Sequence, residues 1–351
     1  MRVAVVGSGG VGGWLGALLQ SSGAAEVLFV GRPGSPHTLA LQTAGLVFTS
    51  ADESESCTLA SVDCIASDEV GSAGPVDYVL LCTKTWQLDD AVLSAIPPLL
   101  HPDGHTVVLT TQNGVEAHDR VAERCGQGCV LAAVTRVAAY VDSPGVVVKT
   151  EAHWRSANAS PTRRSRGAWR RCSSCSPPPA SRPRPPTTSS PRSGPSSYRW
   201  VPSAPWAPSL GLPSSAPSPS LRLSPADFSH KAGAQDVLIG IPETRAVVEA
   251  AMNEIVAVAH ALNIGVDAGF PQEYLSTSAK TSPPGTTVST IRDVLNGSAS
   301  EVLELSGAVV RHGLATGTAT PTHSMLVGML LPQERANRGE LEFTLAGVNK
   351  L

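Results

Sequence analysis

Arg2-Val3-Ala4-Val5-Val6-Gly7-Ser8-Gly9-Gly10-Val11-Gly12 is the stretch that decides the fold, because a short apolar run leads directly into the pattern G-x-G-x-x-G. Residues 2–7 have the valine content of a buried strand, and the apolar residues of 14–19 recur at helical spacing before Gly23. Three glycines so spaced allow a tight turn, close approach of the backbone to a diphosphate, and close packing of the helix. The stretch predicts the start of a Rossmann-like dinucleotide-binding domain; the alternative is an ordinary glycine-rich turn. The predicted diphosphate-binding residues are Gly7, Ser8, Gly9, Gly10, Val11 and Gly12.

The second predicted strand, residues 26–30, is followed by Gly31 and Arg32. An NAD-specific site usually places Asp or Glu here to hydrogen-bond the ribose 2′-hydroxyl. A guanidinium suits a 2′-phosphate instead, because it is permanently charged and contacts phosphate oxygens in a fork. Arg32 therefore favours NADP (NADPH) as the cofactor, and the alternative is a surface arginine without a partner.

Two further strands are predicted at residues 77–82 and 106–110, and they are followed by Lys84 and Asn113. Ligands bind outside the carboxyl ends of the strands in an open parallel sheet, so we expect both residues at the cofactor edge. The alternatives are a solvated loop lysine and a simple Asn-Gly turn. Residues 137–141 and 146–148 predict a hairpin that closes the domain.

Composition bounds the class of protein. A length of 351 residues allows two domains, and no apolar run is long enough to span a membrane. Because the first predicted strand begins at residue 2, we expect a soluble, cytoplasmic protein without a targeting segment. The seven cysteines are irregularly spaced, which favours free thiols over a disulfide framework. Cys172-Ser173-Ser174-Cys175 has no second pair, so we predict no metal site, and we expect neither a nucleic-acid nor a membrane partner.

A segment of unusual composition interrupts the chain. Residues 152–226 contain 11 Arg, 16 Pro and 19 Ser but no Lys, Asp or Glu, and organised sequence stops after Trp154 and resumes near Gly233. Such a composition cannot bury enough apolar surface to offset its conformational entropy. We favour the hypothesis that residues 155–232 are mis-translated, read in a wrong frame or across a mis-called intron. A basic, proline-rich linker that binds a partner and an inert disordered insertion are the alternatives.

The second half of the chain has helical periodicity. An apolar face runs from Pro242 to Asn263, and further helices are predicted at 301–313 and 322–331. The predicted fold class is α/β, with an N-terminal Rossmann-like domain and an all-α C-terminal domain. An active site is expected in the cleft between them.

The ordered motifs resemble the ketopantoate reductase (2-dehydropantoate 2-reductase) family over residues 1–154 and about 233–331. The resemblance is carried by the glycine loop and Arg32, by Thr83-Lys84-Thr85-Trp86-Gln87, by Gln112-Asn113-Gly114-Val115, by Ser289 with Ile291 and Asp293, by Glu301, and by Ser306 to Val310 with Thr320-Pro321. It implies a helical domain like the C-terminal domain of 6-phosphogluconate dehydrogenase. It also implies NADPH-dependent reduction of 2-dehydropantoate to pantoate, a step toward pantothenate and coenzyme A.

The resemblance further implies roles for single residues. Gly7, Gly9 and Gly12 would hold the diphosphate, and Arg32 and Lys84 would bind the phosphate at the adenosine end. Asn113 would lie between the nicotinamide ribose and the substrate. Ser289 would bind the substrate, and Glu301 would orient it near the reacting centre, so that Asn113, Ser289 and Glu301 are the predicted substrate-binding residues and Glu301 the predicted catalytic one.

The sequence departs from the family pattern at the general acid. The family's lysine, in a Trp-x-Lys-Leu context, and an Asn-Pro-Leu-Thr-like stretch after it are not found, and both belong where the Arg/Ser/Pro segment lies. We do not assign the role to Lys231, Lys149 or Lys280, none of which lies in a comparable context.

The predicted domains are 1–154 for the cofactor, 155–232 for the Arg/Ser/Pro segment, 233–335 for substrate and dimerisation, and 336–351 as a tail. A homodimer is the candidate assembly. The alternatives to a ketopantoate reductase are a catalytically impaired NADP-binding pseudoenzyme and a related reductase of another 2-oxoacid.

Overall fold

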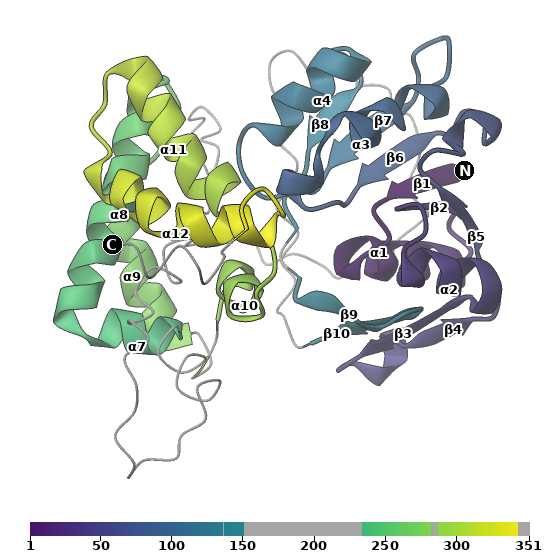
Figure 1. The fold of residues 1–351 in the computed structure, drawn as a ribbon, viewed down its shortest axis with the longest axis horizontal. Coiled ribbons are helices and arrows are strands. Elements are labelled where there is room, and N and C mark those ends of the chain that lie inside the picture. Colours follow the sequence, from purple (N-terminus) through teal and green to yellow (C-terminus); the bar gives the residue numbers. More distant parts are fainter. Residues whose placement is uncertain (136, 151–233, 282–284, 286, 343–351) are drawn as a thin grey trace, which may run out of the picture. The chain divides into compact units, whose positions relative to one another are not determined.

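The computed structural model describes residues 1–135, 137–150, 234–281, 285 and 287–342 (Figure 1). These residues form two compact units, and the chain passes from one to the other within 151–233. The predicted boundaries at 154 and 232 and the Cys172–Cys175 pair fall in that stretch, outside the described residues.

A six-stranded parallel sheet forms the centre of the first unit. Its strand order is β5-β2-β1-β6-β7-β8. The strands are β1 (Arg2–Val6), β2 (Glu26–Gly31), β5 (Asp63–Ala66), β6 (Tyr78–Leu81), β7 (Val107–Thr110) and β8 (Val130–Ala132). The helices are α1 (Gly10–Ser21), α2 (Pro36–Ala44), α3 (Asp90–Ser94) and α4 (Ala117–Cys125), with short 3-10 turns at Glu53–Glu55, Val70–Ser72, Thr85–Gln87 and Pro97–Leu99. The Rossmann-like prediction is confirmed.

A second sheet lies across α1 from the first. Its order is β4-β3-β10-β9, with β3 (Leu46–Ser50), β4 (Cys57–Leu59), β9 (Ala139–Ser143) and β10 (Val146–Lys149). The predicted hairpin is present as antiparallel β9 and β10, with Gly145 at φ +80° in its turn. The hairpin does not extend the main sheet, however, because β10 pairs in parallel with β3.

The two faces of the main sheet bury separate cores. One face packs with the second sheet around Trp14, Phe29, Phe48 and Val147, all at most 4% exposed. Glycines of α1 permit this packing, because a Cβ at Gly13 would lie 2.6 Å from Val147 Cγ2. The other face packs under α4 and the Pro97–Leu99 turn. α1 is therefore held between two sheets, which fixes the loop at its start (Figure 1).

The described residues of the second unit form helices only, which confirms the all-α prediction. They are α7 (Gln235–Gly240), α8 (Pro242–Ala261), α9 (Phe270–Thr281), α10 (Ser289–Leu295), α11 (Val302–Thr316) and α12 (Pro321–Asn337). The apolar face of α8 packs against neighbouring helices through the fully buried Val248 and Ala251, beside Leu275 and Ile291. The predicted end of the last helix at 331 is wrong, since α12 continues through Pro332 to Asn337.

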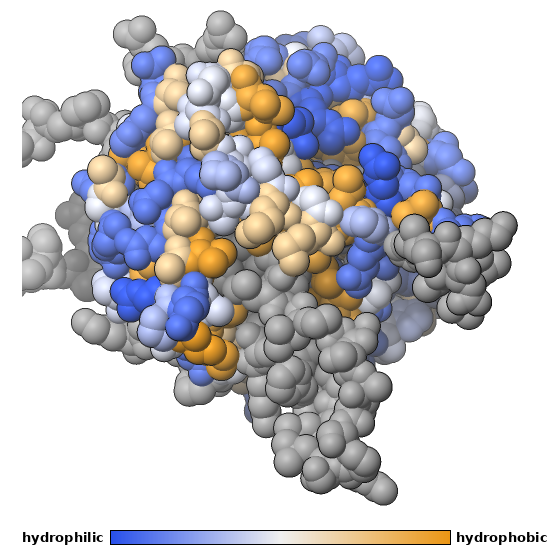
Figure 2. All heavy atoms as spheres, turned by 60° about the vertical axis from the view of Figure 1, so that its left-hand side comes forward, coloured by the Kyte–Doolittle hydropathy of each residue, from blue (hydrophilic) through white to orange (hydrophobic). Residues whose placement is uncertain are grey.

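Hydrophobic and hydrophilic residues are interspersed on the face of the protein that Figure 2 shows. Leu314, Met325 and Met329 of α11 and α12 are large apolar side chains that are more than half exposed. No helix in the described ranges is both long enough and apolar enough to cross a membrane.

Candidate dinucleotide-binding site

The predicted cofactor residues of the first unit gather at one edge of the main sheet. β1 pairs with β2 on one side and β6 on the other, so the strand order reverses between β1 and β6. In open α/β sheets a ligand crevice forms outside the carboxyl ends of the strands at this point. The loops that begin there are 7–9 after β1, 32–35 after β2, and 82–84 after β6.

The packing of the protein requires glycine at two of the three positions of the G-x-G-x-x-G motif. Gly7 has φ +94°, and a Cβ on it would lie 2.6 Å from the backbone nitrogen of Thr83. A Cβ on Gly12 would lie 2.1 Å from the carbonyl oxygen of Gly7, so only glycine lets α1 approach β1 so closely. A Cβ on Gly9 would meet no atom within 4 Å. The protein itself thus does not require glycine at position 9, whereas a ligand bound against the backbone would.

The start of α1 suits an anion. Gly9 is its N-cap, no side chain caps the helix, and its first turn holds no acidic residue. The first amide groups of a helix have no intrahelical acceptor, and the helix dipole adds positive potential there. A diphosphate is the group that such a glycine loop and helix start bind in dinucleotide-binding folds.

His37 of α2 ties this loop to the second sheet. Its Nδ1 accepts a hydrogen bond from the Gly145 N–H at 3.1 Å, which leaves the Nε2–H to donate to the Ser8 carbonyl oxygen at 2.9 Å. Burial lowers the pKa of His37, partly offset by the Ser8 hydrogen bond. The neutral ring therefore holds the loop, a role that the sequence pattern did not indicate.

Arg32 follows the last residue of β2. Its side chain is exposed, and its guanidinium makes no hydrogen bond or ion pair with any other described residue. Adjacent strands lie about 4.8 Å apart, so the backbone of Arg32 begins the loop next to the glycine loop that follows β1. Its position fits the binding of a phosphate on the adenosine ribose.

Side-chain hydrogen bonds join the loops after β6 and β7. The Thr85 hydroxyl donates to the Asn113 carbonyl oxygen at 2.6 Å, and Gln112 Nε2 donates to Thr83 Oγ1 at 3.0 Å. The half-buried Lys84 and the exposed Asn113 are thereby held on neighbouring loops at the same edge as the glycine loop. Gln112 Oε1 is buried without a hydrogen-bond partner among the described residues, so a bound group could supply a donor there.

Gly9→Ala and Gly12→Ala form a matched pair that separates cofactor contact from folding. We expect Gly9→Ala to change stability by less than about 0.5 kcal/mol, because Gly9 has φ −64° and open space, but to weaken NADPH binding about tenfold or more through lost contact with the diphosphate. Gly12→Ala should cost about 1–3 kcal/mol of stability through overpacking. Thermal unfolding and fluorescence titration with NADPH measure the two effects. Unchanged NADPH affinity in Gly9→Ala would contradict this placement of the diphosphate.

Ser289 and Glu301 lie in the helical unit. Ser289 is the first residue of α10 and is half-buried, whereas Glu301 is the N-cap residue of α11 and is 3% exposed. A carboxylate so deeply buried needs hydrogen-bond partners or bound ligands. The structure gives Glu301 a fixed backbone, because its carbonyl oxygen accepts from Leu305 N–H at 2.9 Å.

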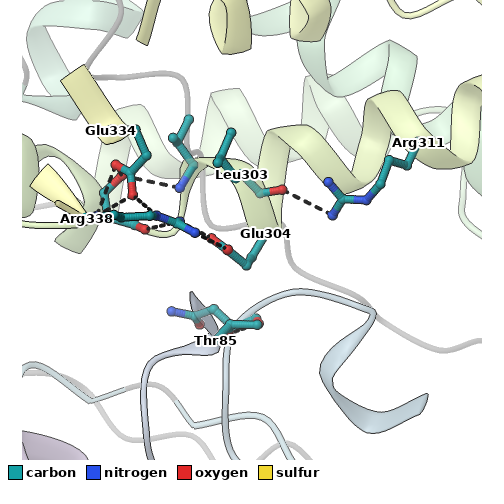
Figure 3. Close-up of polar contacts among 9 residues, drawn as sticks. Thr85, Leu303, Glu304, Arg311, Glu334 and Arg338 are labelled. Carbon is teal, nitrogen blue, oxygen red and sulfur yellow. Dashed lines mark hydrogen bonds and ion pairs between the residues drawn. The ribbon is translucent and has the colours of Figure 1, made fainter. Parts of the chain in front are cut away.

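A buried ionic network fixes the residue before Glu301 (Figure 3). Glu334 of α12 accepts hydrogen bonds from the Ser300 backbone N–H at 3.0 Å and from the Ser300 hydroxyl at 2.6 Å. Arg338 Nε donates to Glu334 at 2.7 Å, and its other nitrogens donate to Glu304 at 3.0 and 2.9 Å. This network anchors the end of α12, which explains why the helix continues past Pro332. The sequence pattern missed it, because its members are far apart in the chain.

Three lysines, Lys149, Lys231 and Lys280, were considered for the proton donor and not assigned that role. Lys149 forms an ion pair with Glu55, and its Nζ lies 5.8 Å from the centre of the Trp14 ring, so it has a structural role between the sheets. Lys231 and the side chain of Lys280 lie outside the described residues. No lysine in the described part of the chain is assigned as the general acid.

Comparisons with known proteins identify the family to which this sequence is similar. The family model described as ketopantoate reductase PanE/ApbA matches residues 3–158, and the model of the C-terminal part of the same family matches residues 230–334. A 2-dehydropantoate 2-reductase from Caulobacter vibrioides is 25% identical over 328 residues, which cover 93% of this chain and 97% of that protein. One from Mesorhizobium japonicum is 30% identical over 171 residues, or 43% of this chain and 49% of that protein, so this match spans about half of the relative.

Solved structures share the fold. A ternary structure of D-mandelate dehydrogenase with NADH and anilino(oxo)acetate has a TM-score of 0.68 at 18% identity and covers 96% of this chain and 99% of that one. A dimeric ketopantoate reductase from Staphylococcus aureus has a TM-score of 0.61 at 14% identity, covering 96% and 100% of the two chains.

Proposed function

The chain belongs to the ketopantoate reductase family, a family of oxidoreductases, and we propose that it reduces 2-dehydropantoate to pantoate with NADPH. The observation that carries the proposal is the open backbone at Gly9 beside the uncapped start of α1, with the unpaired Arg32 after the adjacent strand. The two relatives described as 2-dehydropantoate 2-reductases support the choice of substrate.

The residues of the first unit would hold the cofactor, which supplies the hydride when it is bound. The amide groups at the start of α1 bind the diphosphate, and Gly7, Gly9 and Gly12 keep that surface open and in place. Arg32 and Lys84 bind the 2′-phosphate from two loops of the same sheet edge. Asn113, held through its carbonyl oxygen by Thr85, orients the nicotinamide ribose next to the substrate.

The residues of the helical unit would hold the substrate. Ser289 donates a hydrogen bond to the substrate carboxylate or hydroxyl, and Glu301 orients the reacting end. Reduction of the keto group also needs a proton for the developing alkoxide. None of the described residues is assigned as the proton donor. In the family, the lysine that donates this proton belongs in the interval that residues 155–232 occupy here.

The proposed function is tested by following NADPH oxidation in single turnovers with enzyme in excess, with 2-dehydropantoate and with other branched 2-oxoacids. The proposal is supported if 2-dehydropantoate is turned over faster than the other 2-oxoacids. It is also supported if Glu301→Gln has slower turnover but the same NADPH affinity. Faster reduction of another 2-oxoacid would favour the second candidate, a related 2-oxoacid reductase; D-mandelate dehydrogenase shows that the same fold accommodates anilino(oxo)acetate. NADPH binding without reduction of any 2-oxoacid would favour a pseudoenzyme.

We propose a homodimer as the assembly, because a ketopantoate reductase of the same fold from Staphylococcus aureus is described as dimeric.

Arg32→Ala should remove most of the preference for NADPH over NADH. We expect the parent chain to prefer NADPH about tenfold or more, because a hydrogen bond between charged groups contributes about 1.5–3 kcal/mol. Fluorescence titration of both variants with both cofactors measures the preference. Arg124→Ala is the control, since Arg124 is an exposed arginine in the last turn of α4 that bonds Ser94. Equal affinity of the parent for the two cofactors would contradict the role of Arg32.

A further inference from the structure

Two histidines and an aspartate meet on a surface turn that the proposed function does not use. The turn His101-Pro102-Asp103-Gly104-His105 lies between the Pro97–Leu99 turn and β7. It therefore lies at the amino end of β7, whereas Asn113 follows the carboxyl end of the same strand. Its chemistry can be separated from that of the cofactor edge.

The three side chains converge. Asp103 Oδ1 lies 2.6 Å from His105 Nδ1 and 3.9 Å from His101 Nδ1. The two imidazole rings are tilted by 31° to each other with centroids 3.9 Å apart, and one ligand atom from each of the three residues lies within 4.8 Å of the others. With metal–ligand bonds of about 2.0–2.2 Å, the ligands of a tetrahedral ion are about 3.3 Å apart. The two distances to Asp103 lie on either side of that value.

The backbone holds the turn in this form. Gly104 N–H donates to the His101 carbonyl oxygen at 2.9 Å, and Gly104 has φ +76°. His101 N–H donates to Thr106 Oγ1 at 2.8 Å, and that hydroxyl donates to the Val76 carbonyl oxygen at 2.7 Å in a buried position. A fixed backbone reduces the entropy that a ligand would lose in gathering the three side chains. Both rings are about a third or more exposed, so an ion can reach them from solvent.

We propose that His101, Asp103 and His105 form a binding site for a late first-row divalent cation, of which Zn²⁺ is the representative. Two imidazoles and one carboxylate suit Zn²⁺, Ni²⁺ and Cu²⁺, whereas Mg²⁺ and Ca²⁺ prefer oxygen ligands. Three protein ligands leave the remaining position to water. The ion replaces the Asp103–His105 contact and cross-links the turn that leads into β7. No metal site was predicted from the sequence; the spacing H-x-D-x-H becomes informative only in the structure, where the turn brings the two rings together.

The test is titration of the full-length, metal-free protein with Zn²⁺ by calorimetry, followed by thermal unfolding with and without Zn²⁺. We expect Zn²⁺ binding that raises Tm and is reversed by chelation, no effect of Mg²⁺, and tighter binding of Cu²⁺ than of Zn²⁺. His105→Ala and Asp103→Asn should each weaken this binding tenfold or more, since loss of even an outer partner of a metal ligand costs about 10–100-fold.

The matched control is His118→Ala, which removes a histidine that also contacts an aspartate, at 3.4 Å from Asp119, but has no third ligand among the described residues. It should bind Zn²⁺ like the parent. The Tm of His105→Ala and that of the parent, both measured with a chelator present, should be equal, which would show that the variant folds. Because the chain has seven cysteines, Co²⁺ spectra decide the ligand type, since thiolate ligands give an intense charge-transfer band. Zn²⁺ binding that is absent in the parent, unchanged in His105→Ala, or carried by thiolates would overturn the proposal.

Discussion

The chain as printed is expected to reduce 2-dehydropantoate about 10²–10⁴-fold more slowly than a form whose residues 155–232 are replaced by an in-frame translation of the same gene. General acid catalysis contributes a factor of this size, and the lysine expected to supply it is not found in the printed sequence. Both forms should bind NADPH, because the glycine loop, Arg32, Lys84 and Asn113 all precede residue 150. Single-turnover NADPH oxidation and fluorescence titration measure turnover and binding on the same samples.

Controls for this comparison separate catalysis from folding. Glu301→Gln in the replaced form should lower turnover without changing NADPH affinity, whereas a poorly folded sample would lose both. Sequencing the transcript tests the premise, since an in-frame message identical to the printed chain would remove the mis-translation hypothesis. Comparable, rapid turnover by both forms would show that another residue donates the proton.

Glu334→Ala is expected to lower the free energy of unfolding of the helical unit by about 3–5 kcal/mol, as for other buried pairs that lose one partner. Glu334 is 2% exposed, and its removal leaves the Ser300 N–H and hydroxyl without their acceptor and Arg338 with one carboxylate fewer. Burial lowers the pKa of Arg338, but the hydrogen bonds to Glu304 and Glu334 outweigh this effect. The pKa is raised overall, so the guanidinium stays charged. A drop in Tm of about 10 °C or more should follow.

Glu340→Ala is the matched control, because Glu340 is an exposed acid just beyond α12. Its stability should stay within about 0.5 kcal/mol of the parent. Thermal and urea unfolding followed by circular dichroism measure both variants. A loss below about 1 kcal/mol in Glu334→Ala would mean that water replaces the carboxylate at Ser300 and Arg338.

Local patterns were enough to predict four adjacent strands of the main sheet, β2, β1, β6 and β7, and the helices α1, α8, α11 and α12. The valine-rich run before Gly7 predicts a strand, and the helical spacing of apolar residues in α8 predicts a helix, because both patterns are local. The parallel topology of the sheet then places Lys84 and Asn113 at the same edge as the glycine loop. Roles for Ser289 and Glu301 came only from the family resemblance and stay predictions. The sequences that flank Ser289 and Glu301 contain no pattern that specifies substrate binding.

Features that depend on distant contacts were not predictable. β3 and β4 are short strands that depend on distant partners: β4 pairs with β3, β3 pairs with β10, and both pack on α1. His37 could not be recognised, because its hydrogen-bond partner Gly145 is 108 residues away. The same reason hid the ionic network of Glu334 and Arg338, which lies at the end of α12 beyond the predicted helix end at 331.

The parallel pairing of β10 with β3 has a consequence for the order of folding during synthesis. β3 leaves the ribosome almost 100 residues before its partner at Val146–Lys149, and until then one side of α1, including Trp14, lacks the cover of Val147. Non-local pairings of this kind slow folding, because a long loop must close first. The described strands of the first unit can therefore complete their pairing only when residue 149 has emerged. A nascent chain released there would already contain every strand that the structure describes in the two sheets.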